Sequence, residues 1–230
     1  MVLLGSTISA CKKDDETISE AASFTIVNAI AGTTPLVTNF DNSKKLYFYQ
    51  TAQQIAAYGF TKYSGYLGDY NLGIYRLADT TKTQYQINLK LEPNSIKTLY
   101  LSGTVAETEG MLISEKIPVY KQTDSLIGVR FINLLKGGGP VNVALRSSVS
   151  NIATALDYKG ISGFQAISAR TKDPVSYVFD FKDASTGAVI SSYTLSSLPS
   201  LLSKSVTVVL RGIRGGAGTS IPGTFLVNNY

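Results

Sequence analysis

One structural pattern occurs twice in the sequence, and this repeat limits the possible folds more than any other feature. Residues 26–37 align without gaps on residues 131–142. Both copies read as an apolar strand that contains an asparagine, a glycine-containing turn, a proline and a second strand. Each half later reaches an apolar strand closed by a glycine, Gly103 in the first half and Gly212 in the second. The repeat predicts two copies of one fold.

A shorter match lies between these segments. Residues 63–68 align with residues 158–163 through a shared Tyr-x-Gly, which pairs Tyr63 with Tyr158. With this pairing, the first half carries extra residues before the motif and the second half carries extra residues after it. Such differences in length fit two related domains, because loops tolerate insertions better than strands do.

Much of the sequence consists of short apolar segments with the alternation or β-branching of strands. They are residues 24–30, 45–49, 84–91, 96–101, 127–134, 141–145, 175–181, 189–195 and 206–210. Turn signals separate them at residues 92–95, 172–174 and 183–187. Many short strands at regular spacing favour a sandwich or barrel over alternating strands and helices. We therefore predict an all-β chain, with at most a helical turn or bulge at residues 53–58.

Composition fits a folded protein and argues against several functions. The 230 residues are 44% hydrophobic and 16% charged, which is enough for a core and too apolar for disorder. The net charge of +5 is scattered in pairs of basic residues, so nucleic-acid binding is not expected. The chain has no histidine, and thus lacks the commonest general base and the commonest metal ligand.

No pattern in the sequence indicates catalysis. Residues 137–139 and 212–218 are rich in glycine, but neither segment is followed by the Lys-Ser/Thr of a phosphate-binding loop. Both are expected to form turns. The aspartates are too dispersed to mark a carboxylate pair or a calcium loop: Asp69, Asp79, Asp157, Asp173, Asp180 and Asp183. We expect a non-enzyme without metal or cofactor.

The only cysteine, Cys11, follows an apolar run that ends in small residues, and a charged cluster at residues 12–15 comes directly after it. Signal peptidases require small residues before the cut, and a thiolate can accept a diacylglycerol group. The alternative is a buried cysteine that packs as a small hydrophobe, which these charged flanks disfavour. The apolar stretch 2–10 is short and no basic residue precedes it, which suggests a truncated gene start.

These observations divide the chain into four parts. We expect a signal peptide at residues 1–10, the lipidated Cys11 with a flexible tether at residues 11–22, and two β-sandwiches at residues 23–122 and 123–230. No segment reaches the roughly 20 apolar residues of a membrane-spanning helix, so membrane attachment is expected through the lipid alone.

Two parts of the sequence resemble known families. The region around Cys11 resembles the bacterial lipobox, and the charges after it resemble the surface-export signal of Bacteroidetes lipoproteins. The repeat resembles domain of unknown function 4397, through residues 129–133, 158–160 and 206–212. The resemblance implies tandem immunoglobulin-like or transthyretin-like β-sandwiches in a cell-envelope protein, with no established catalytic residues. The first copy departs from the family by having Thr25-Ile26 where Arg-Phe is usual.

Aromatic side chains are concentrated in the first half. They are Tyr47, Phe48, Tyr49, Tyr58, Phe60, Tyr63, Tyr66, Tyr70 and Tyr75. Tyrosine offers a flat apolar face and a hydroxyl, which suits sugar and peptide ligands, but strand aromatics also pack into cores. The match with Tyr158 suggests a structural role for Tyr63. Tyr58, Tyr66 and Tyr70 lie close to glycines and are the candidates for exposure and ligand binding.

We therefore expect an outer-membrane lipoprotein, exposed at the cell surface or facing the periplasm, that binds a glycan or protein without catalysis. One alternative is a fimbrillin-like structural subunit that polymerises by strand exchange. Such a subunit requires an arginine processing site near its start, and the first arginine here is Arg76. A hydrolase built from the scattered acids is the remaining alternative.

Overall fold

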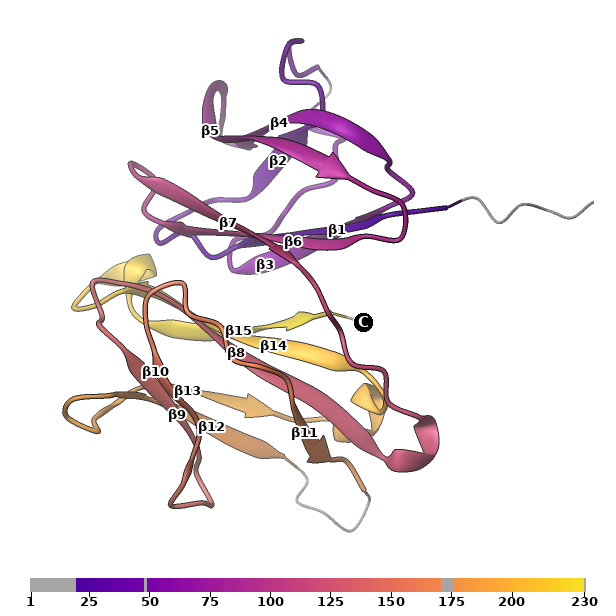
Figure 1. Cartoon of the computed structure of the whole chain (residues 1–230). Coiled ribbons are helices and arrows are strands. Elements are labelled where there is room, and N and C mark those ends of the chain that lie inside the picture. Colours follow the sequence, from indigo (N-terminus) through magenta and orange to yellow (C-terminus); the bar gives the residue numbers. More distant parts are fainter. Residues whose placement is uncertain (1–19, 48, 171–175, 230) are drawn as a thin grey trace, which may run out of the picture.

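The structure is a computed structural model that describes residues 20–47, 49–170 and 176–229, and Cys11 lies outside these residues. Strands dominate the described part of the chain, and its helical segments are three short 3-10 turns: η1 (Gln122–Asp124), η2 (Leu198–Leu201) and η3 (Gly218–Ser220). The predicted all-β class is confirmed (Figure 1). Among the described residues, no helix is long and apolar enough to cross a membrane.

The first half forms two sheets. Its strands are β1 (Ser23–Asn28), β2 (Leu36–Asn39), β3 (Gly59–Ser64), β4 (Gly68–Arg76), β5 (Asp79–Leu91), β6 (Ile96–Gly103) and β7 (Thr108–Ser114). One sheet has the order β3-β1-β6-β7, and the other has the order β2-β4-β5. The two sheets enclose one apolar core around buried residues such as Phe24, Leu36, Leu72 and Leu99.

The second half forms the same arrangement. Its strands are β8 (Leu126–Lys136), β9 (Val141–Leu145), β10 (Asn151–Leu156), β11 (Gln165–Ser168), β12 (Tyr177–Asp183), β13 (Val189–Leu195), β14 (Ser205–Ile213) and β15 (Gly223–Asn228). The sheets have the orders β11-β8-β14-β15 and β10-β9-β12-β13. The orders match those of the first half strand for strand, except that β10 has no counterpart there.

The repeat found in the sequence is real at two of its three anchors. Asn28 and Asn133 are both fully buried, and the Nδ2 of each donates to two backbone carbonyls, at residues 34 and 56 and at residues 139 and 156. The strands that carry these asparagines pair in parallel with β6 and β14. Gly103 and Gly212 lie at equivalent places near the ends of these two strands, with positive φ angles of 82° and 111°.

The third anchor, the match of Tyr63 with Tyr158, is wrong. Tyr63 lies within β3 opposite Phe24 and is buried in the first core. Tyr158 instead lies in the turn before β11. The turn residues that correspond are Tyr58 and Lys159, which have φ angles of 55° and 65° and each precede a glycine. A Tyr-x-Gly is common enough in turns to align by chance.

The prediction of individual strands was wrong in places. Residues 45–47 form no strand. Residues 53–58 form a β-bridge between Ile55 and Leu36 and a turn at residues 57–58, without a helical turn. Strands β3, β4, β7, β10, β11 and β15 were not predicted. Most of them carry polar residues or glycine on one face, because only the other face packs on a core.

A third apolar cluster joins the two halves. It contains buried residues from both of the sheets that face each other in Figure 1: Val27, Ala29, Tyr100, Ile132, Leu134, Val209 and Val227. Strands β1, β6, β8 and β14 are therefore apolar on both faces, one toward their own sandwich and one toward the other.

Candidate functional site

Tyr58 is half-buried at the contact between the two halves. Its hydroxyl donates to the carbonyl of Thr219, and the guanidinium of Arg211 lies 3.6 Å from the centre of its ring. Because Arg211 covers the ring face, that face is not open to a ligand. Tyr58 and Arg211 make a cation–π contact that links the halves.

Tyr66 and Tyr70 belong to an aromatic cluster, defined here as Phe40, Tyr63, Tyr66 and Tyr70. Tyr66 stacks on Phe40 with ring centres 4.9 Å apart and an interplanar angle of 16°. Tyr63 and Tyr70 meet Phe40 edge to face at 5.1 and 5.4 Å. Such pairs stabilise one another beyond the area that they bury.

The hydroxyl groups divide the cluster into supporting and exposed members. The Tyr63 hydroxyl shares a hydrogen bond of 3.1 Å with Thr38, and burial raises the pKa of Tyr63. Tyr70 is half-buried and donates to the carbonyl of Leu67 at 2.8 Å. Tyr66 is 42% exposed, and the described residues offer its hydroxyl no partner. Tyr66 is thus the residue of the cluster that is best placed to meet a ligand.

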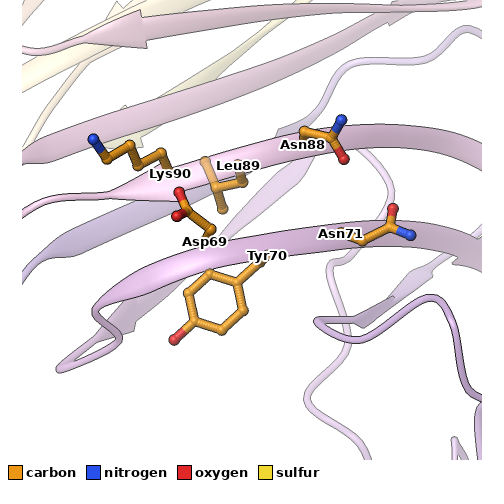
Figure 2. A pocket seen from close by; sticks show the side chains of 6 residues that line it. All are labelled: Asp69, Tyr70, Asn71, Asn88, Leu89 and Lys90. Carbon is orange, nitrogen blue, oxygen red and sulfur yellow. The ribbon is translucent and has the colours of Figure 1, made fainter.

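A shallow hollow of about 310 Å³ lies close to the aromatic cluster. Its lining consists of Asp69, Tyr70, Asn71, Asn88, Leu89 and Lys90, on β4 and β5 (Figure 2). Leu72 and Ile74 face the core, so strand alternation places Asp69 and Asn71 on the outer face of the sheet. Lys90 and Asn88 are their cross-strand partners. The hollow is therefore bordered by polar side chains on the outside of the first sandwich.

A larger hollow of about 630 Å³ lies farther along the same strands. The segment after β2 and the β4–β5 hairpin line it: Asn42, Ser43, Lys44, Lys45, Leu46, Tyr49, Tyr75, Thr80, Thr81 and Thr83. Neither hollow was predicted from the sequence. The sequence signal at this place was the alternation of polar residues from Gln86 to Lys90. This alternation indicates a strand with one side facing solvent, and it does not indicate a hollow.

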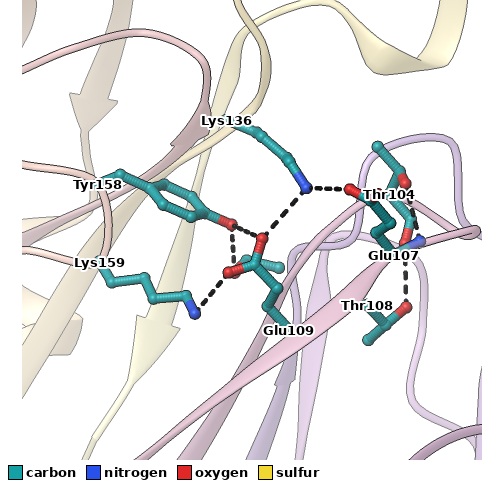
Figure 3. A network of polar contacts seen from close by, with 8 residues as sticks. Thr104, Glu107, Thr108, Glu109, Lys136, Tyr158 and Lys159 are labelled. Carbon is teal, nitrogen blue, oxygen red and sulfur yellow. Dashed lines mark hydrogen bonds and ion pairs between the residues drawn. The ribbon is translucent and has the colours of Figure 1, made fainter.

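Charged side chains gather at the contact between the halves (Figure 3). The carboxylate of Glu109, on β7, forms ion pairs with Lys159 at 2.6 Å and with Lys136 at 3.2 Å. Lys136 also reaches Glu107 at 2.7 Å. The hydrogen bond from Lys159 is the main cause that holds the pKa of Glu109 below its usual value. This network connects the two sandwiches.

A second ion pair is buried between the halves. Arg130 of β8 pairs with Glu115 at 2.6 Å, and their side chains are only 6% and 1% exposed. The same guanidinium donates to the hydroxyls of Thr207 and Tyr100. Glu115 follows directly after β7, so this pair fixes the connection between the sandwiches. The corresponding residue of the first half is Thr25.

Two further acids, Asp180 and Asp183, serve local structure. Arg146 holds Asp180 at 2.6 Å and lowers its pKa. The Ser185 hydroxyl and the backbone of Thr186 lower the pKa of Asp183 to about 2. Both groups are therefore carboxylates at neutral pH. Across residues 20–47, 49–170 and 176–229, no three acidic, cysteine or histidine side chains gather in a way that could hold a metal ion.

Comparison with known proteins gives weak similarities only. No family model matches the chain, and no curated protein matches it. Among solved structures, the chain is similar to family 41 carbohydrate-binding modules from streptococcal virulence factors, at 11% identity and a TM-score of 0.28 over 90% of this chain and 97% of that one. A streptococcal virulence factor that binds alpha-glucan matches at 12% identity and a TM-score of 0.27, over 83% and 92%. The Bacillus anthracis TIE protein matches at 8% and 0.24, over 91% and 44%.

Proposed function

We propose that the chain is a non-catalytic binding protein of the bacterial cell envelope. In this proposal a lipid on Cys11 anchors it to the outer membrane, and Tyr66 and Tyr70 of the first sandwich contact a glycan or protein ligand. The aromatic cluster carries the proposal. Phe40 holds the Tyr66 ring by stacking at 4.9 Å while Tyr66 stays 42% exposed. An aromatic side chain held by its neighbours loses little conformational entropy when a ligand packs against it.

The binding part of the proposal is tested with Tyr66→Ala on glycan arrays and in pull-downs from envelope extracts. Tyr47→Ala is the matched control, because Tyr47 is 67% exposed and makes no ring contact with the cluster. We expect Tyr66→Ala to lower ligand capture about ten-fold, equivalent to roughly 1.4 kcal/mol, while Tyr47→Ala leaves capture unchanged. Equal capture by both variants would remove the aromatic cluster from the proposal.

The anchor is tested separately. Small residues before Cys11 and charges after it support lipidation at this thiol. A Cys11→Ala variant is expected to lose incorporation of labelled fatty acid and to leave the membrane fraction. Unchanged labelling and fractionation would contradict the anchor without affecting the binding site.

A further inference from the structure

The outer face of β4 and β5 carries a row of polar side chains that the proposed function does not use. Four cross-strand positions form it: Asp69 with Lys90, Asn71 with Asn88, Gly73 with Gln86, and Tyr75 with Thr83. We call this row the polar ladder. It runs between the two hollows described above, since the first is lined by Asn71 and Asn88 and the second by Tyr75 and Thr83.

Contacts within the ladder hold several of its side chains in place. The amide of Gln86 donates to Oδ1 of Asn71 at 2.7 Å. The Tyr75 hydroxyl donates to Oδ1 of Asn42, a residue that lies against Gly73. A Cβ at Gly73 would overlap the Asn42 side chain, so glycine is what lets Asn42 join the ladder. Groups that are already ordered lose less entropy when they bind.

The ladder still has unused hydrogen-bonding groups. Within the part of the chain that the structure describes, the Asn88 side chain has no hydrogen-bond partner, and neither do Nδ2 of Asn71, Oε1 of Gln86 and Nδ2 of Asn42. A side-chain amide supplies two donors and an acceptor without carrying charge. Donors and acceptors therefore alternate along an uncharged strip. At its end Lys90 lies across from Asp69 and pairs with Glu92 at 3.1 Å.

We infer that the polar ladder binds a neutral, extended polysaccharide chain. Sugar hydroxyls both donate and accept hydrogen bonds, and amides match them without requiring charge on the ligand. From Asp69 to Tyr75 the strand spans about 20 Å, which accommodates several sugar units in a row. The two hollows at its ends extend this surface.

Other occupants fit the ladder less well. None of the exposed large hydrophobic side chains in the described residues lies on β4 or β5, so a protein partner would find no apolar anchor there. An acidic polymer would require a cluster of unpaired cations, whereas Lys90 pairs with Glu92 at 3.1 Å and Lys44, in the second hollow, pairs with Asp41 at 2.8 Å. The inference goes beyond the proposed function, because it places a separate site beside the aromatic cluster and specifies the ligand chemistry.

The test is a binding titration of the full chain carrying Cys11→Ala with linear α-glucan, β-glucan, mannan and xylan, and with acidic polygalacturonate. We expect at least one neutral polysaccharide to bind and polygalacturonate to bind at least ten-fold more weakly. The double variant Asn71→Ala/Asn88→Ala is expected to bind the neutral polymer about ten-fold more weakly, or weaker still. Thr194→Ala, an exposed position on the outer strand β13 of the second half, serves as the matched control.

Three outcomes would overturn the inference. The first is that no neutral polysaccharide binds, and the second is that polygalacturonate binds as well as the neutral polymers. The third is that the double asparagine variant, shown by circular dichroism to be folded, binds like the control. If Tyr66→Ala abolishes binding in that third case, the ligand belongs to the aromatic cluster, and the proposed function stands while the ladder does not.

Discussion

The two sandwiches share one topology but differ on the outer faces of their equivalent sheets. In the second half, Asp180 on β12 accepts two hydrogen bonds from Arg146 and one from Ser192. The polar side chains at this place on the sheet therefore bond to one another. In the first half, β4 and β5 carry amides with unused donors and acceptors. Duplicating a fold preserves its cores, because packing constrains them, whereas solvent-facing positions are free to diverge.

A second difference lies at the edge of the same sheets. The second half places β10 beside β9, whereas in the first half the described residues 40–47 and 49–58 approach β2 through the single bridge between Leu36 and Ile55. This segment also contributes Phe40 to the aromatic cluster and Asn42 to the polar ladder. Replacing a regular strand by an irregular segment thus supplies side chains to both candidate surfaces.

The largest expected effect comes from making the second half resemble the first at Arg130. Arg130→Thr leaves Glu115 buried without its cation, and we expect the free energy of unfolding to fall by about 3–5 kcal/mol. Urea denaturation measures this loss. The matched control is Arg76→Thr, which removes a half-exposed ion pair with Asp79 and should cost at most about 1 kcal/mol. Equal losses would show that the buried pair does not hold the sandwiches together.

The buried asparagines provide a direct comparison of equivalent positions. Asn133 also accepts the N–H of Leu135 at 3.0 Å, whereas Oδ1 of Asn28 is buried without a partner among the described residues. We expect Asn133→Ala to cost about 2–3 kcal/mol and Asn28→Ala about 1 kcal/mol less. Denaturation of both variants under the same conditions measures the difference. A larger loss for Asn28→Ala than for Asn133→Ala would contradict the order that their contacts imply.

The smallest effect concerns the contact between the halves. Lys159 lowers the pKa of Glu109, so the stability from this carboxylate is present above the unfolded pKa of about 4.3 and is lost as pH falls through the folded pKa. Glu109 is partly exposed, and its contribution should stay below about 1 kcal/mol. Thermal unfolding from about pH 6 to about pH 2 should show Glu109→Gln less stable at the upper end and equal to the unchanged protein at the lower end. A pH-independent difference would contradict this role.

The all-β class and the repeat were predictable because they depend on local patterns. The asparagine in β1 and β8 and the glycine near the end of β6 and β14 occur at fixed places in short apolar segments, so alignment found them. Tyr63 was misaligned because a short turn motif carries little information about which tyrosine faces a core. The polar strands were not predicted because their apolar residues, such as Leu72 and Ile74, are interrupted by Asn and Gly.

The candidate site was predictable only in part. An aromatic surface was expected, and Tyr66 is exposed within a cluster, but Tyr58 is covered by Arg211, a residue far from it in the sequence. The polar ladder depends on the register between β4 and β5, which pairs Asn71 with Asn88. Register and contacts between domains are set by tertiary packing, and a single sequence does not display them.

The central claim is that ligand binds to the first sandwich and not to the second. The most direct test is an NMR titration that records the backbone and side-chain amide signals. The ligand is an oligosaccharide fragment of whichever neutral polysaccharide binds with the highest affinity. We predict shifts for residues of β4 and β5, including the side-chain amides of Asn71 and Asn88, and unchanged signals for β12 and β13. Shifts confined to β12 and β13, or spread equally over both sandwiches, would contradict the claim.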